Sequence, residues 1–400
     1  MGKPIFFLTK YSLNYNITLK RDDKMIYLDY SATTPVDKSV LDTYVKVCEK
    51  YIGNPNSLHK LGFEAKKLID DATNQIKRLL DTDKEVIYTS GASEANNLAI
   101  FGVCRKYKNR GNHIITTRLE HSSVIEPIKE LEKEGYKVDY VRIDQDGRVD
   151  LEDLENLITD KTILVSICVV NSEIGIEQDI ESISKIVKKY PKIIFHSDFT
   201  QGIGKKRISF NNVDLISMSA QKFYGMKGVG CLLRNKKVEI DPIIYGGKST
   251  TIYRSGTPAT SLIASLSKAL RLAVENVDNN YKYIENLNKY LIDKLSKLDT
   301  VVINSTKYSI PHIINISVYG VKPETLLHAL EEEEIYISTK TACNKGEDIS
   351  IPVYELTNDE DRSKHSLRIS ISHLTKKEEL DKFIEVFEEK LQKLTQLTNK

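Results

Sequence analysis

The chain has 400 residues, of which 40% are hydrophobic and 28% charged, and its 58 basic and 56 acidic side chains leave a formal net charge of +2. This composition is typical of a globular protein and excludes a disordered or collagen-like chain. The near-neutral charge provides no global field that would attract nucleic acid or an anionic membrane, so we expect neither as a partner. A chain of this length exceeds the size at which one hydrophobic core usually stops growing, which predicts a large domain and a smaller one.

Five cysteines are scattered along the chain, and none belongs to a CxxC pair. This odd and dispersed set argues against a disulfide framework and against a structural zinc site, so we expect no metal. The apolar run at residues 4–8 is too short for a membrane span, and no small-residue cleavage site follows it. The sequence therefore predicts a protein of the reducing cytoplasm.

From residue 26 onward, short β-branched runs alternate with longer amphipathic stretches, which is the pattern of βα units around a mainly parallel sheet. Strands are predicted at residues 85–89, 113–117, 137–142, 163–169, 192–196 and 215–219. The segments between them have apolar residues at helical spacing and charges on the other face, which predicts helices at 57–80, 122–134, 151–158 and 180–189.

The pattern changes after residue 260. Residues 260–298 predict a long helix, either broken or continuous, and strands predicted at 301–303 and 313–318 begin a second, α+β pattern. Residues 376–393 predict a closing amphipathic helix with a solvated Glu- and Lys-rich face. The boundary between two domains is therefore expected inside the long helix.

Polar side chains cluster just past the carboxyl ends of five predicted strands, where open α/β sheets bind their ligands. The strand at 85–89 is followed by the run Ser90-Gly91-Ala92-Ser93-Glu94 and then by a helical pattern. Small residues at a helix start expose backbone N–H groups, which favours an anion and most simply a phosphate. Ordinary helix capping explains the same run equally well.

The other four strands end in residues that bear an acid, an imidazole, an amide or an amine: Glu120-His121, Asn171, His196-Ser197-Asp198 with Gln201 beyond, and Ser219-Ala220-Gln221-Lys222. Pyridoxal phosphate needs such a set, because it takes an amine for a Schiff base, a carboxylate at the pyridine nitrogen, a flat group against the ring and donors for the phosphate. The convergence of these groups on one sheet edge predicts a pyridoxal phosphate site.

These motifs, in one unbroken order, resemble those of the cysteine desulfurases of the class V aminotransferase group. The resemblance rests on Tyr27-Leu28-Asp29-Tyr30-Ser31-Ala32-Thr33-Thr34-Pro35, Gly53-Asn54-Pro55, Ser90 to Glu94, Lys222 in a Lys-x-x-Gly-x-Lys-Gly context, and Arg254-Ser255-Gly256-Thr257. It implies an α/β fold, fold type I of the pyridoxal-phosphate-dependent transferases. The expected parts are an extension at 1–24, a segment at 25–37 packed with the small domain, a large domain at 38–276 with a mainly parallel seven-stranded sheet, and a small α+β domain at 277–400.

The resemblance also implies roles for single residues. Lys222 would hold the cofactor and move the substrate α-proton, Asp198 would pair with the pyridinium nitrogen, and His121 would stack on the ring. The remaining cofactor contacts would come from Gln201 and Asn171 at the ring hydroxyl, from Ser93, Ser219 and Gln221, and from Thr257 across the interface of a homodimer. Arg368, with Asn171 nearby, would bind the carboxylate of the substrate L-cysteine by a bidentate pair.

Cys343 is the residue whose presence distinguishes a cysteine desulfurase from other pyridoxal-phosphate-dependent enzymes. Its thiolate would attack the substrate sulfur, which leaves L-alanine and an enzyme persulfide. A flexible stretch running to Arg368 would let it pass sulfur to an acceptor protein in iron–sulfur cluster assembly or in the thiolation of tRNA or cofactors. The contexts of the other four cysteines indicate buried structural thiols.

The chain departs from the family at four places, which are the Lys-bearing surroundings of Cys343, Gln221 in place of a histidine, Lys248-Ser249-Thr250 in place of a Gly-rich run, and His373 in place of an arginine. Three functions stay open on this sequence. The first is a cysteine desulfurase, and the second is another enzyme of the same fold, such as a selenocysteine or cysteine-sulfinate lyase or an aminotransferase. The third is a non-catalytic paralogue that binds a partner, against which the intact Lys222, Asp198 and Arg368 argue.

Overall fold

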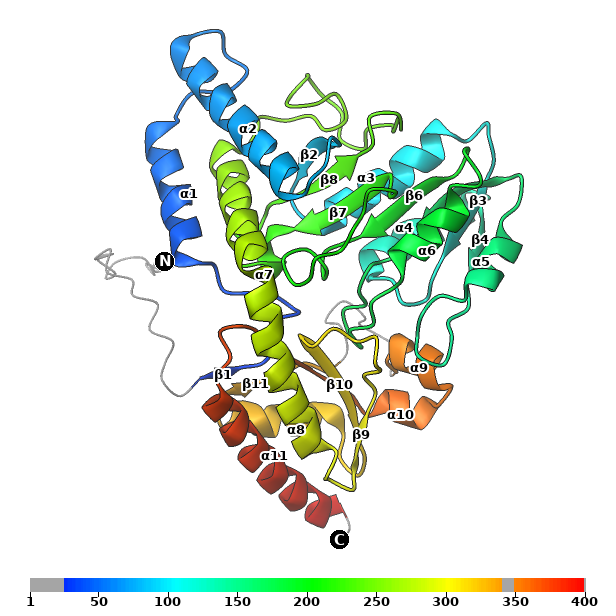
Figure 1. Ribbon diagram of the computed structural model, residues 1–400, viewed down its shortest axis with the longest axis vertical. Helices are drawn as coiled ribbons and strands as arrows, with labels where there is room; N and C mark the ends of the chain where they lie inside the picture. The colour runs from blue at the N-terminus through cyan, green and yellow to red at the C-terminus, as the bar shows by residue number, and fades with distance from the viewer. Residues whose placement is uncertain (1–24, 340–348, 399–400) are drawn as a thin grey trace, which may run out of the picture.

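The computed structural model describes residues 25–339 and 349–398 (Figure 1). The extension expected at 1–24 and the predicted nucleophile Cys343 lie outside the described residues. In the described part of the chain, no helix is both long and apolar enough to cross a bilayer.

A seven-stranded sheet forms the centre of the larger half. Its strands are β2 (Glu85–Thr89), β3 (His113–Thr116), β4 (Lys137–Tyr140), β5 (Thr162–Ser166), β6 (Ile194–Asp198), β7 (Leu215–Ser219) and β8 (Gly230–Arg234). They lie in the order β2-β8-β7-β6-β5-β3-β4, and only β8 runs against its neighbours. The predicted α/β fold with a mainly parallel seven-stranded sheet is confirmed, and the carboxyl ends of the other six strands meet at one edge.

Helices cover both faces of this sheet. One face packs against α3 (Ala92–Lys106) and α4 (Ser122–Lys133). The other face packs against α2 (Lys60–Leu79), α5 (Leu151–Leu157), α6 (Ile180–Val187) and the first half of α7 (Thr260–Leu295). Helix α1 (Lys38–Lys50) lies on α7. Successive strand residues alternate between these two cores: Val86 and Tyr88 belong to one, and Ile87 belongs to the other. Burial on both faces is the reason why most of the strands read as near-continuous apolar runs, whereas the edge strand β4 has exposed residues and alternates.

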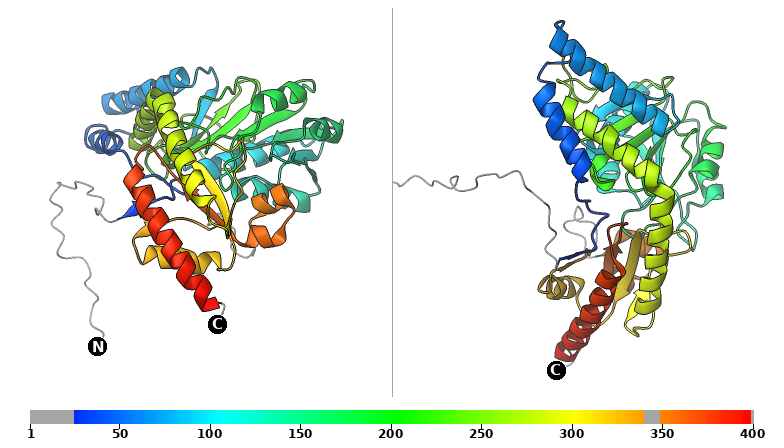
Figure 2. Two further views of the ribbon diagram at one scale, coloured as in Figure 1. Left: turned by 60° about the horizontal axis from the view of Figure 1, so that its bottom comes forward. Right: turned by 60° about the vertical axis from the view of Figure 1, so that its left-hand side comes forward.

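The smaller half of the molecule has a core of its own around an antiparallel sheet. The order of this sheet is β12-β10-β9, and its strands are β9 (Val301–Ile303), β10 (Ile313–Val318) and β12 (Ser366–Ser370). The core also contains α8 (Pro323–Glu331), α11 (Lys377–Thr398) and the parallel pair of β1 (Ile26–Tyr27) and β11 (Ile335–Tyr336). Figure 2 shows α7 running from the large sheet to the small one. On this helix, Leu266 packs in a core of the large sheet and Leu291 packs in the core of the smaller half. The domain boundary at 276/277 stays a prediction.

The long helix predicted at 260–298, which the sequence left either broken or continuous, is the single α7, because no Gly or Pro interrupts its apolar spacing. Four local predictions need correction. Strand β8 was not among the strands predicted from the sequence. The stretch expected to be flexible before Arg368 contains α9 (Ile351–Thr357) and α10 (Glu360–Lys364), which Ser350 and Asp359 cap at their first turns. Strand β6 starts two residues later than predicted, because a turn closed by Ile193 N–H and Tyr190 C=O precedes it.

The fourth correction concerns a cysteine. Cys48 is exposed on α1, whereas Cys104, Cys168 and Cys231 are buried as predicted.

Candidate active site

A cavity of about 330 Å³ opens at the edge where the strands of the large sheet end. It brings together most of the predicted site residues: Ser93, His121, Asp198, Gln201, Ser219, Gln221, Lys222 and Arg368. Seven of them come from the ends of β2, β3, β6 and β7 in the large sheet, and Arg368 comes from β12 in the small sheet, so the topology of the two sheets gathers them. This is the place where an open α/β sheet is expected to bind its ligand.

One end of the cavity is the turn between β2 and α3. Gly91 has φ 156°, a conformation that side chains disfavour, and it starts α3 without any side-chain cap. Glu94 instead reaches back to the Ser90 N–H at 2.7 Å and pairs with Arg254 at 2.8 Å. The first amides of α3 therefore face the cavity without a side-chain acceptor, and Ser93 and Ser219 line the same end. Uncapped amides at a helix start favour a bound anion.

The acid and the imidazole at the centre are linked by one hydrogen-bond network. Asn96 donates to Asp198 Oδ2 at 2.8 Å and to Ser123 Oγ at 2.9 Å. Ser123 Oγ in turn lies 2.8 Å from His121 Nδ1. Thr200 N–H donates to the other oxygen of Asp198, so both carboxylate oxygens are fixed. This network orients a carboxylate and a ring relative to each other across the cavity.

His121 caps α4, and its Nδ1 accepts the Ser123 N–H at 3.1 Å. Burial lowers the pKa of His121, while the charge of Asp198 opposes this effect. The ring is therefore neutral near pH 7 with its hydrogen on Nε2, because Nδ1 acts as an acceptor. A neutral ring can lie flat against an aromatic ligand without burying a charge.

Lys222 lies in the short turn after β7. Its Nζ donates to the backbone carbonyls of Ser31 at 2.7 Å and Ala32 at 2.5 Å. Thr34 binds the Gln221 carbonyl through both its N–H and its hydroxyl, so the 31–34 segment and the lysine turn are tied together. The amine is thereby held at the wall of the cavity, opposite the uncapped turn.

Two amides were expected at the ring hydroxyl, and the structure separates them. Gln201 lines the cavity and donates to the Ser31 carbonyl at 2.9 Å. Asn171 instead lines a neighbouring pocket, donates to the Leu119 carbonyl at 2.7 Å, and accepts the N–H groups of Glu173 and Ile174. Its side chain is occupied by the backbone of its own loop, so in this structure it does not reach the cavity.

Arg368 closes the cavity from β12 and is only 2% exposed. Its Nη2 pairs with Asp29 at 2.8 Å and its Nη1 donates to the Ser172 carbonyl at 3.1 Å. The Nε–H has no partner among the described residues. The guanidinium is thus fixed in the wall with donor capacity left for a carboxylate.

Thr257 is exposed and lies outside the cavity of its own chain. Sequence reasoning missed Asn96 and Ser123, which hold Asp198 and His121, and it assigned no role to Asp29, which holds Arg368. Asn96 carries a weak signal, since it is a polar residue on the buried face of an otherwise apolar helix. In the part of the chain that the structure describes, no group of three or more metal-ligating side chains occurs.

Glu120 is a buried carboxyl beside this site and gives a pH-dependent prediction. Thr117 and the Cys168 N–H bind its Oε1, and burial raises its pKa to about 8, helped by the charge of Asp198. The folded protein therefore keeps a proton that an unfolded Glu releases near pH 4, so stability falls as the pH rises from about 4 to 8. Glu120→Gln cannot ionise and should gain up to about 4–5 kcal/mol relative to the wild type across this range, at roughly 1.4 kcal/mol per pKa unit.

Urea unfolding at pH 5, 6.5 and 8 measures this difference. Glu126→Gln alters an exposed glutamate and serves as the matched control, with no change in the pH dependence expected. Parallel pH profiles for Glu120→Gln and the wild type would contradict the assignment.

Comparison with known proteins gives a consistent set of relatives. Residues 26–383 match the family described as Aminotransferase class-V. The "Cysteine desulfurase IscS" of Rickettsia bellii is 38% identical over 382 residues, which cover 93% of this chain and 92% of that protein. A solved "NIFS-LIKE PROTEIN" is 34% identical with a TM-score of 0.87, over 92% of this chain and 99% of that one. A structure described as "SspA in complex with cysteine" is 29% identical with a TM-score of 0.76, over 87% of this chain and 99% of that one.

Proposed function

The chain belongs to the aminotransferase class-V family and, within it, to the cysteine desulfurases, and from this premise we propose that it uses pyridoxal phosphate to remove sulfur from L-cysteine. The observation that carries the proposal is the single cavity that holds an amine, an acid with its imidazole, an uncapped helix start and a buried guanidinium. The similar SspA has been solved with cysteine, which supports this substrate.

The side chains of the cavity fit the cofactor. The uncapped start of α3 with Ser93 and Ser219 would take the phosphate, and Asp198, fixed by Asn96, would take the pyridinium nitrogen. His121 would stack on the ring, Gln201 would reach its hydroxyl, and Gln221 would support the adjoining turn. When bound, pyridoxal phosphate supplies an electron sink for the bonds at the substrate α-carbon.

The residues of the chain supply binding and proton transfer. Arg368 holds the substrate carboxylate and thereby fixes the orientation of the amino acid in the cavity. Lys222 would hold the cofactor and would carry the α-proton as a base, from a position set by the carbonyls of Ser31 and Ala32. Asp198 would face the ring nitrogen with a carboxylate whose two oxygens are fixed by Asn96 and the Thr200 N–H.

Cys343 accepts the sulfur. L-cysteine and the Cys343 thiol are converted into L-alanine and a Cys343 persulfide, so the carbon–sulfur bond of the substrate breaks and a sulfur–sulfur bond forms on the enzyme. The persulfide then serves an acceptor protein, for cluster assembly or thiolation chemistry. The odd number and wide spacing of the five cysteines, with no CxxC pair in the sequence, support the reducing cytoplasm as its compartment.

Incubation with L-cysteine and a reductant tests the proposal. Equal amounts of L-alanine and sulfide are expected. Alanine that forms from cysteine sulfinate or selenocysteine but not from cysteine would favour a lyase, and no product from any amino acid would favour a non-catalytic paralogue. Either result would refute the desulfurase assignment.

Arg368→Ala should weaken the binding of L-cysteine by about 2–4 kcal/mol, because a charge-assisted pair with the substrate carboxylate is lost. The value of KM for L-cysteine measures this loss. Asp29→Asn is the matched variant, since it removes the ion pair of Arg368 but keeps the guanidinium, and a smaller effect is expected. An unchanged KM in Arg368→Ala would show that the carboxylate binds elsewhere.

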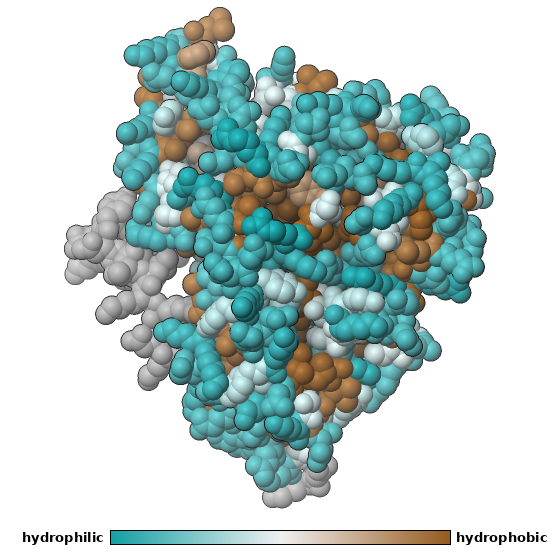
Figure 3. Space-filling view, viewed as in Figure 1, coloured by the Kyte–Doolittle hydropathy of each residue, from teal (hydrophilic) through white to brown (hydrophobic). Residues whose placement is uncertain are grey.

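A homodimer is expected from two features of the surface. Thr257 lies outside the cavity of its own chain, and large apolar side chains are exposed near the α1–α2 connection and on the loop after β8, namely Ile52, Leu58, Phe63, Tyr245 and Ile252. Figure 3 shows hydrophobic side chains at the tip of the molecule near the start of α2. A two-fold interface would bury such patches and bring Thr257 to the partner's site.

Light scattering measures the oligomeric state. The wild type should have the mass of two chains, and Leu58→Asp should raise the dimer Kd at least tenfold, because a charge would be buried at the interface. Leu374→Asp changes an exposed leucine on the smaller half and should leave the mass unchanged. A wild-type monomer with full cofactor content would contradict the prediction.

A further inference from the structure

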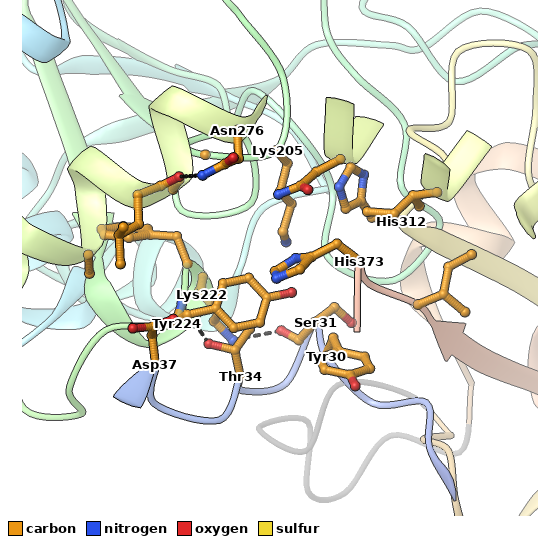
Figure 4. Close-up of a pocket in the computed structure, with 18 residues that line it drawn as sticks. Tyr30, Ser31, Thr34, Asp37, Lys205, Lys222, Tyr224, Asn276, His312 and His373 are labelled. Carbon is orange, nitrogen blue, oxygen red and sulfur yellow. Dashed lines mark hydrogen bonds between the residues drawn. The ribbon is translucent and has the colours of Figure 1, made fainter. Parts of the chain in front are cut away.

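A second cavity lies on the other side of the 31–34 segment from the proposed cofactor site (Figure 4). It has a volume of about 260 Å³, close to the lower end of the range for small-molecule sites. Its walls come from the 31–34 segment, the β6–β7 connection, the middle of α7 and the residues beside β10 and β12. Ser31 and Lys222 line both cavities. We call this second cavity the α7 cleft.

Lys205 is the most unusual residue of the α7 cleft. It is only 8% exposed, and within the described chain the hydrogen bond of its Nζ is to the neutral Gln201 Oε1. Burial lowers the pKa of Lys205, and the nearby charges of Lys222 and Arg368 lower it further. Among the described residues, no carboxylate opposes these effects on Lys205. A protonated Lys205 would need an anionic partner at this buried place, and the described side chains offer it none.

Two imidazoles lie beside this lysine. His312 is 6% exposed, and its Nδ1 has no hydrogen-bond partner among the described residues. The ring of His373 packs edge-on against Tyr224 with 4.6 Å between the ring centres. Figure 4 shows Lys205, His312 and His373 converging from three separate elements. A neutral imidazole still offers one N–H donor, so the three side chains can together bind an anionic oxygen pair.

Apolar side chains also line the cleft. Ala269, Leu272, Ala273 and Ile284 come from α7, which contributes Asn276 and Asn280 as well, and Ile371 lies next to His312, whose C=O accepts the Ile371 N–H. Asp37 is the single acidic residue among the lining side chains, and it already accepts the Ser39 N–H at 2.8 Å and the Ser39 hydroxyl at 2.6 Å. Three donor side chains together with aliphatic side chains in one cleft match a molecule with a charged head and a short carbon chain.

We propose that the α7 cleft binds a small aliphatic carboxylate, with its carboxylate at Lys205, His312 and His373 and its chain along α7. Such a ligand touches both halves of the protein and the wall that carries Lys222. It therefore stabilises their relative arrangement. The proposal does not rest on the desulfurase reaction, because none of the three donor residues lines the cofactor cavity, although Lys205 is hydrogen-bonded to Gln201, which does.

Calorimetric titration of the purified full-length protein with butyrate tests this site. Butyrate has a carboxylate and a short chain but no amino group, so it cannot enter the reaction as an amino acid. Saturable binding of one butyrate per chain is expected, with no binding of butylamine and only weak binding of inorganic phosphate. Phosphate binding as tight as butyrate, or no butyrate binding, would overturn the proposal.

Three variants locate the bound butyrate. Lys205→Met should weaken binding at least tenfold, and Arg368→Lys should leave it unchanged, since Arg368 belongs to the other cavity. If Lys205→Met does not fold, Asn276→Phe gives the same information by filling the mouth of the cleft, and Asn279→Phe is its exposed control outside the lining. Butyrate binding that is lost in Arg368→Lys but kept in Lys205→Met or Asn276→Phe would assign it to the cofactor cavity and refute the α7 cleft.

Discussion

Lys222→Ala should abolish the yellow, borohydride-reducible chromophore of the purified protein and lower the release of sulfide from L-cysteine by at least about 10²–10⁴-fold, the usual contribution of a positioned proton-transfer group. The reason is geometric, because Lys222 Nζ is fixed by two carbonyls at the wall of the cavity that contains Asp198 and the uncapped turn. Borohydride reduction followed by peptide mapping identifies the labelled lysine.

Lys205 is the natural competitor for this role and provides the matched control. It is also buried, and burial lowers its pKa, so its amine is more readily available as a nucleophile than that of an exposed lysine. However, it lines the α7 cleft rather than the cofactor cavity. Lys205→Met should therefore keep the chromophore, and a chromophore that persists in Lys222→Ala but disappears in Lys205→Met would reverse the assignment.

Six of the seven strands of the large sheet could be predicted from the sequence, because most of them are buried on both faces and their apolar runs need no knowledge of the partner strand. The residues at the strand ends could be predicted for the same reason, since parallel strands deliver them to one edge. Asp198, His121 and Lys222 line one cavity because each follows a strand that ends at this edge. Strand β8 was not among the predicted strands.

The residues that sequence reasoning missed depend on contacts that no local pattern encodes. Asn96 lies 102 positions from Asp198, and Asp29 lies 339 positions from Arg368. Lys205 looks like an ordinary loop lysine until the small sheet and α7 bury it. The short helices α9 and α10 were missed because each is too short for a hydrophobic period, and their caps decide where they begin.

Cys343→Ser should eliminate the gain of one sulfur atom that intact mass spectrometry is expected to detect after brief treatment with L-cysteine, and it should lower sulfide release by roughly 10²-fold or more. The chromophore should persist, because Cys343 is not among the residues proposed to hold the cofactor. The expectation rests on the place of Cys343 in the chain, between β11 and Arg368, where the resemblance to cysteine desulfurases puts the nucleophile.

The other thiols make this experiment specific. Burial raises the pKa of Cys231 to about 12 and also raises those of Cys104 and Cys168, so these three thiols are poor nucleophiles near neutral pH. Cys168 is the sharpest rival, because it lines the cofactor cavity. Cys168→Ala should therefore keep the added sulfur, and so should Cys48→Ser, which removes the exposed thiol on α1. If the added sulfur remained in Cys343→Ser and disappeared in Cys168→Ala, the reacting thiol would be Cys168 in the cavity wall. If both variants released sulfide at the wild-type rate, the chain would belong with the lyases of this fold.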